Sequence, residues 1–183
     1  MASKLIVGLG NPGPEHSITR HNVGFLCADY IAKKLHLNYK YDKKKSVYGK
    51  KRFPPHEVII LKPQTFSNLS GEAVLYIASF LKVDIENVFV IFDDVTLRLG
   101  EAQIQTDLLK IEHNAIFHLC NCLRNDKFIK CGFGIGPIPK HVSLEDYYLE
   151  NFSEPEEKQL EAVYQKVFEL AVMHLQIPLE AAK

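Results

Sequence analysis

The chain has 183 residues, of which 46% are hydrophobic and 24% are charged, and its formal net charge is zero. This length and composition predict one globular domain with a core of ordinary size, and they exclude an intrinsically disordered chain. The longest apolar runs, such as residues 88–92, are far too short to cross a bilayer. We therefore expect neither a membrane span nor a secretion signal.

Segments with strand character alternate with segments of helical character along the chain. Apolar and β-branched runs predict strands at residues 5–9, 47–53, 58–61, 88–92, 103–105 and 132–135. Apolar periodicity predicts helices at 23–35, 70–81 and 113–123, and a last helix that begins at the capping residue Ser153 and stops at Pro178. The alternation favours a single α/β domain over residues 1–183, with helices on both faces of its sheet.

The four cysteines do not form a metal-binding pattern. Cys27, Cys120, Cys122 and Cys131 lie in the predicted helices and in one strand, without Cys-x-x-Cys spacing. His118 lies near two of them in the sequence, but small buried thiols are the simpler interpretation. We therefore expect no bound metal and a reducing, cytoplasmic location.

Charge is unevenly distributed although its sum is zero. Residues 40–52 hold seven bases and one acid, whereas residues 145–161 hold seven acids and one base. The first segment could attract phosphate and the second would repel it. A solvated hairpin and a solvated helix are the simpler interpretation of the two charge runs alone.

A glycine-rich turn follows the first predicted strand. Gly8, Gly10 and Gly13 have the spacing of a dinucleotide-binding fingerprint, which requires a helix to begin directly after the third glycine. Prolines flank that glycine, and residues 15–22 show no apolar helical period. Nucleotide binding is therefore rejected.

The same loop brings an amide, Asn11, and an imidazole, His21, to the carboxyl edge of the predicted sheet, where ligands of open α/β sheets bind. A neutral imidazole can take a proton from water as the water attacks an ester. Asp93 follows the strand predicted at 88–92, and its carboxylate could orient His21. A surface histidine and a turn-forming acid are the alternatives. Because Ser67 and Ser70 lack a G-x-S-x-G motif, no nucleophilic side chain is implied, and we predict direct attack by water.

Three sequence blocks occur in order: GLGNPGPE and TRHN-x-G-F within residues 8–25, KPQTFSNLSG at 62–71, and Asp93-Asp94 followed by Gly100. Together they closely resemble the bacterial-type peptidyl-tRNA hydrolases, which cut the ester between a peptide and the 3′ end of tRNA. The resemblance implies a three-layer α/β/α sandwich with a mixed, twisted central sheet. It also implies a cytoplasmic, monomeric translation enzyme without a cofactor. Its partner would be the acceptor end and 3′ terminus of peptidyl-tRNA.

The resemblance also implies roles for individual residues. His21 would be the catalytic base and Asp93 its supporting acid, while Asn11 would distinguish blocked from free aminoacyl groups. A neutral amide suits that last role because it can both donate and accept hydrogen bonds. Turn formation is the alternative for Asn11.

Four further residues would bind the substrate. By resemblance, Asn68 and Asn114 contact the tRNA end or the peptide. Phe66 and His16 offer flat faces on which the terminal bases could stack. Members of the family usually carry tyrosine at the position of His16, so that contact would be weaker here.

The chain departs from the family pattern in one region above all. The glycine-rich stretch that precedes the His-Asn pair is replaced by residues 107–112, and Gln103, Gln105 and Gly132 stand where basic residues usually hold the tRNA 5′-phosphate. Ser67 replaces a usual methionine. These changes favour the alternative of a non-catalytic RNA-binding or assembly paralogue, whereas the retained site residues favour the enzyme. A hydrolase of some other ester is a third possibility.

Overall fold

A computed structural model describes residues 2–179 of the chain. Seven strands form one mixed sheet in the order β2-β3-β4-β1-β5-β7-β6. They are β1 (Ala2–Gly8), β2 (Tyr41–Asp42), β3 (Ser46–Phe53), β4 (His56–Pro63), β5 (Val88–Arg98), β6 (Ala102–Ile104) and β7 (Ile129–Gly136). The four central strands β4, β1, β5 and β7 are parallel, and the pairs toward both edges are antiparallel.

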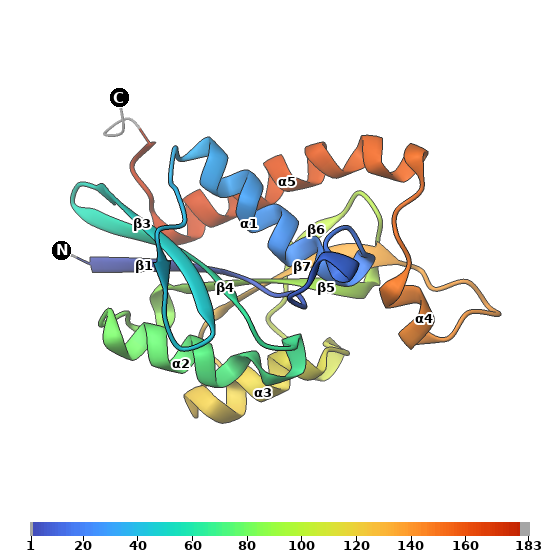
Figure 1. Ribbon diagram of the computed structural model, residues 1–183, viewed down its shortest axis with the longest axis horizontal. Coiled ribbons are helices and arrows are strands. Elements are labelled where there is room, and N and C mark those ends of the chain that lie inside the picture. The colour runs from blue at the N-terminus through green and yellow to red at the C-terminus, as the bar shows by residue number, and fades with distance from the viewer. Residues whose placement is uncertain (1, 180–183) are drawn as a thin grey trace.

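Helices cover both faces of this sheet (Figure 1). α1 (Val23–Lys34) and α5 (Glu154–Leu175) cover one face, and α2 (Ser70–Phe80) and α3 (Asn114–Leu123) cover the other. Side chains alternate along the strands, so in β1 Ile6 joins the core under α1 and α5, whereas Leu5 and Val7 join the core under α2 and α3. The predicted three-layer α/β/α sandwich is confirmed. In the described residues, no helix combines the length and apolar character needed to span a bilayer.

Two predicted boundaries near the site need correction, and two short elements were missed. β5 does not stop at residue 92 but continues to Arg98, because β7 pairs with it as far as Gly136. Asp93 therefore lies inside a central strand instead of following its end. The third helix begins at Asn114, which leaves His113 just before it. β2 and α4 (Leu144–Leu149) were not predicted, since two and six residues are too few to show a period.

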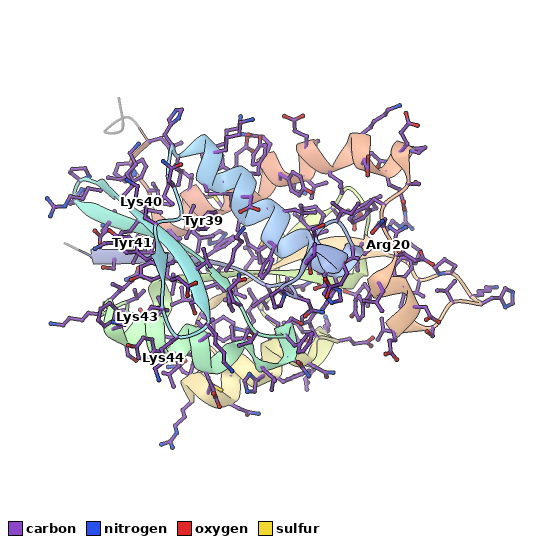
Figure 2. All side chains as sticks on the ribbon, viewed as in Figure 1. Arg20, Tyr39, Lys40, Tyr41, Lys43 and Lys44 are labelled. Atoms are coloured by element: carbon purple, nitrogen blue, oxygen red, sulfur yellow. The ribbon has the colours of Figure 1, made fainter. Side chains whose placement is uncertain are left out.

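A buried arginine anchors the loop between β1 and α1. The Arg20 guanidinium donates two hydrogen bonds to Glu156, at 2.9 and 3.0 Å, and lies over the rings of Tyr147 and Phe152. Glu156 also accepts a bond from the Ser153 N–H, as the predicted capping residue requires. Although burial raises the pKa of Glu156, these hydrogen bonds lower it to about 2. Arg20 thus ties the His21 loop to the start of α5, next to α4 (Figure 2).

Candidate active site

An imidazole and a buried carboxylate meet at the carboxyl edge of the sheet. His21 lies in the single 3₁₀ turn Arg20–Asn22, and its Nδ1 is 2.8 Å from Oδ2 of Asp93. Burial lowers the pKa of His21, but the charge of Asp93 and its hydrogen bond raise it by more, so the pKa lies above the ordinary histidine value. Nδ1–H donates to the carboxylate, which leaves the Nε2 lone pair of the neutral ring available to accept a proton.

A second imidazole, which the sequence analysis missed, shares the same carboxylate. His113 Nε2 is 2.8 Å from Oδ1 of Asp93, and both side chains are buried. Burial raises the pKa of Asp93, but the two imidazoles more than offset this effect and hold the pKa well below its usual range. Asp93 therefore stays ionised, with one N–H facing each oxygen. The position of His113 beside Asn114 was the signal that could have identified it.

The same three residues have a spacing that a cation could bridge. One ligand atom from each of His21, Asp93 and His113 lies within 4.8 Å of the other two, and this is the cluster with metal-like spacing in the described part of the chain. Each imidazole is nevertheless within hydrogen-bond distance of its own carboxylate oxygen, so shared protons account for the close approach. A metal-free site stays a prediction.

Asn11 is held by two neighbouring segments. Its backbone N–H donates to Oδ1 of Asn22 at 2.8 Å, and Nδ2 of Asn22 donates back to the Asn11 carbonyl at 2.9 Å. The Ser67 N–H donates to Oδ1 of Asn11 at 2.9 Å. Because Oδ1 is engaged, Nδ2 is the end of the Asn11 amide that remains for a ligand. Asn22 was not predicted as a site residue.

Ser67 touches the His21 imidazole directly. Its Oγ lies 2.7 Å from Nε2 of His21, at the start of the 3₁₀ turn Ser67–Leu69 that leads into α2. The sequence motif gave no reason to include Ser67 in the site, since it lacks the flanking glycines of a nucleophile elbow. The contact joins residues 46 positions apart in the sequence.

An open cavity of about 660 Å³ lies over these groups. Five predicted site residues line it: Asn11, His21, Phe66, Asn68 and Asn114. The lining also contains residues that were not predicted, among them Ser67, Glu112, His113 and Tyr148. The ring centroid of Tyr148 is 4.9 Å from that of His21. His16 is not among the described lining residues, and its Nε2 lies 3.6 Å from the carboxylate of Glu15. The structure therefore brings together every predicted site residue except His16.

Known proteins resemble this chain in both sequence and fold. The peptidyl-tRNA hydrolase family model matches residues 5–183. This chain belongs to the peptidyl-tRNA hydrolase family. A peptidyl-tRNA hydrolase of Elusimicrobium minutum is 36% identical over 98% of this chain and 96% of its own length, and one from Thermoanaerobacter is 41% identical over 86% and 84%. The crystal structure of the Acinetobacter baumannii peptidyl-tRNA hydrolase is 26% identical, with a TM-score of 0.86 over 98% of this chain and 91% of that one.

Within this family member, a second cavity, of about 520 Å³, is lined by Gln103, Gln105 and Lys110, among other residues. Gln105 Nε2 donates to Asp94 at 2.9 Å. A Cβ at Gly132 would lie 2.5 Å from an oxygen of the same carboxylate, so any side chain at this position would have to displace Asp94. Lys110 lies 3.8 Å from Asp107, which offsets its charge. The three positions assigned to phosphate binding by resemblance thus carry no positive charge here.

Proposed function

We propose that this protein hydrolyses the ester between an N-blocked peptidyl or aminoacyl group and the 3′ end of tRNA. Such a reaction would recycle tRNA from prematurely released peptidyl-tRNA. The observation that carries the proposal is the His21–Asp93 pair in the wall of an open cavity. Hydrolysis requires a water molecule to lose a proton, and the neutral imidazole of His21 receives it. Asp93 holds the tautomer and stabilises the imidazolium that forms.

Neutral and aromatic groups around His21 suit the two halves of this substrate. The amides of Asn68 and Asn114 can bind a peptide or a ribose without adding charge. The Phe66 ring is 58% exposed at the cavity, so a terminal base can stack on it. We further propose that the protein acts as a cytoplasmic monomer and needs neither a metal nor a cofactor.

The decisive test is release of an N-acetyl-aminoacyl group from tRNA by the purified protein, with the unblocked aminoacyl-tRNA as the matched substrate. Rapid cleavage of the blocked substrate and slow cleavage of the free one are expected. Binding of both tRNAs without cleavage of either would instead establish the non-catalytic paralogue. Cleavage of simple esters alone would establish the third alternative, another ester hydrolase.

Asn11→Asp should lower kcat/KM for the blocked substrate by about tenfold to a hundredfold. Aspartate still accepts the bond from the Ser67 N–H, but it loses the Nδ2 donor and brings a negative charge into the lining of the cavity. Steady-state cleavage measures the effect. The control is Asn38→Asp, which adds the same charge at an exposed loop position. Equal activity of the two variants would mean that Asn11 forms the turn and takes no part in substrate binding.

The enzyme should discriminate poorly between tRNAs with and without a 5′-phosphate. Each missing contact to the 5′-phosphate removes one contribution from counterion release. The affinity for tRNA should therefore be lower and should depend less on salt concentration. The lysine-rich segment lies around β2 and β3, where Figure 2 labels Lys40, Lys43 and Lys44. In the strand order this is the opposite edge of the sheet from Gln103 on β6, so we do not expect these lysines to replace the contact.

This prediction is checked by comparing cleavage of matched substrates, with and without the 5′-phosphate, across a salt series. Gln103→Lys with Gln105→Lys should restore a preference for the phosphate and steepen the salt dependence. A strong preference in the unmodified protein would contradict the prediction. An unchanged salt slope in the double variant would show that these positions do not face the phosphate.

A further inference from the structure

Three side chains stand in a row beneath the cavity: the Ser67 hydroxyl, the His21 imidazole and the Asp93 carboxylate. Ser67 Oγ is 2.7 Å from Nε2 of His21, and Nδ1 of the same ring is 2.8 Å from Oδ2 of Asp93. These distances match the nucleophile–base–acid arrangement of covalent hydrolases, which geometry and not sequence position defines. We propose that Ser67 is a nucleophile that takes the acyl group from tRNA before water releases it. This inference rests on the proposed esterase function.

The hydrogen bonding assigns a direction to each proton. Asp93 is ionised and can only accept, so Nδ1 of His21 carries the hydrogen and Nε2 carries the lone pair. The Ser67 hydroxyl therefore donates to Nε2 of His21. This is the protonation state in which a serine hydroxyl is activated, because the proton it loses on attack has an acceptor already in place.

The backbone of Ser67 is fixed on both sides. Its N–H donates to Oδ1 of Asn11 at 2.9 Å, and its carbonyl accepts from the Ser70 hydroxyl at 2.7 Å. These contacts hold Oγ at the base without help from the substrate, and such preorganisation is what makes a nucleophile effective. The Ser67 side chain is largely buried but lies in the lining of the active-site cavity.

A donor for the developing negative charge lies beside Ser67. Because Oδ1 of Asn11 accepts the Ser67 N–H, the Nδ2 end of that amide remains to donate to the carbonyl oxygen of an ester placed over Ser67. The amide of Asn68, the next residue along the chain, lines the same cavity. Donors aimed at an oxyanion contribute strongly to catalysis of acyl transfer.

The reaction balances with the groups present and water. Ser67 Oγ bonds to the ester carbonyl carbon, and its proton passes to Nε2 of His21. The tetrahedral species breaks the bond to the terminal ribose oxygen, which takes the proton from His21 and leaves with the tRNA. Water then attacks the ester formed on Ser67, gives its proton to His21, and releases the peptide carboxyl group. His21 returns the proton to Oγ, so the serine is restored.

Direct attack by water and attack by Ser67 predict opposite effects of one substitution. The Ser67 hydroxyl is hydrogen-bonded to Nε2 of His21, which is the nitrogen that would have to accept the proton of a directly attacking water. If water attacks directly, Ser67→Ala frees this nitrogen and the rate stays equal or rises. If Ser67 attacks, Ser67→Ala lowers kcat by about a hundredfold or more. The alanine keeps both backbone hydrogen bonds, so the variant should fold.

The test uses the full chain and N-acetyl-aminoacyl-tRNA. Rapid acid quench and mass spectrometry should find the acyl group on the peptide that contains Ser67. Ser67→Cys should carry it as a thioester, which provides a second measurement independent of the alanine variant. Ser79→Ala, on the exposed side of α2, is the control and should keep both the adduct and the rate.

The outcomes separate the inference from the proposed function. If the wild-type protein cleaves the substrate, no adduct forms on Ser67 or on the thiol of the Ser67→Cys variant, and Ser67→Ala keeps its rate, the covalent route is overturned and the esterase function stands. If the wild-type protein does not cleave the substrate at all, the proposed function itself fails. An adduct on Ser67 together with a slow alanine variant establishes the triad.

Discussion

Replacing His21 with alanine should lower the rate of ester cleavage by about a hundredfold to ten-thousandfold, the usual cost of losing a positioned base. Both reaction routes considered above need Nε2 of His21 to receive a proton, so the loss does not depend on which hydroxyl attacks. The fold and the affinity for tRNA should change little, because the loop is anchored separately by Arg20 and Asn22. Single-turnover cleavage measures the loss, and filter binding measures the affinity.

His141→Ala is the matched control for this experiment, since that imidazole is exposed. It should leave both the rate and the affinity unchanged. A His21→Ala variant that turns over at nearly the wild-type rate would remove His21 from the chemistry. The search for the base would then move to His113, whose Nε2 already bonds to Asp93.

Local patterns were sufficient to predict the layers of this fold. Five of the six predicted strands and all four predicted helices overlap observed elements of substantial length. The sixth predicted strand, at 103–105, corresponds to the short β6. What local pattern could not give was the length of β5. Its extension depends on pairing with β7, which is a long-range contact.

In the site, too, residues within a specific local motif were predicted, whereas residues brought in by long-range contacts were not. Asn11 and His21 could be found because the loop that carries them has a specific sequence. The bond between Ser67 and His21 could not be found, because it depends on how the turn before α2 lies against the loop after β1. His113 is a similar case, since only folding brings it to Asp93, twenty positions earlier in the sequence.

Some of the charged residues in the two runs make specific contacts within the fold. In the lysine-rich segment, Lys43 Nζ lies 3.7 Å from the centroid of the Phe80 ring, and Lys50 pairs with Glu57 at 3.4 Å. In the acidic segment, Glu156 holds Arg20. These residues of the two runs therefore stabilise the fold. The contacts agree with the solvated hairpin and solvated helix expected from the sequence.

Asp93→Asn should reduce the maximal rate by about a thousandfold to ten-thousandfold, because the amide cannot accept from both imidazoles at once. An amide has one acceptor oxygen, and its NH₂ group would face whichever N–H is left. One of the two rings must then turn or change tautomer. If that ring is His21, Nε2 carries a hydrogen and can no longer act as the base.

The pH dependence should move as well, and its direction follows from the causes of the shift. In the wild-type protein the charge of Asp93 raises the pKa of His21 above the ordinary value, so the rate should increase with pH through a midpoint above that value. In Asp93→Asn only burial remains, and burial lowers the pKa of His21. The midpoint should therefore shift to lower pH while the plateau falls.

As the pH falls, His21 is protonated in the wild-type protein before it is protonated in the Asp93→Asn variant, because its pKa is higher in the wild type. The ratio of wild-type to variant rates should therefore be larger at high pH than at low pH. Values of kcat/KM between about pH 5 and pH 9 test this. Asp94→Asn is the control, because Asp94 binds Thr96 and Gln105 and neither imidazole. It should leave the midpoint and the plateau nearly unchanged. A midpoint that stays in place in Asp93→Asn, with only the plateau lowered, would mean that Asp93 supports the structure of the site without setting the charge state of its base.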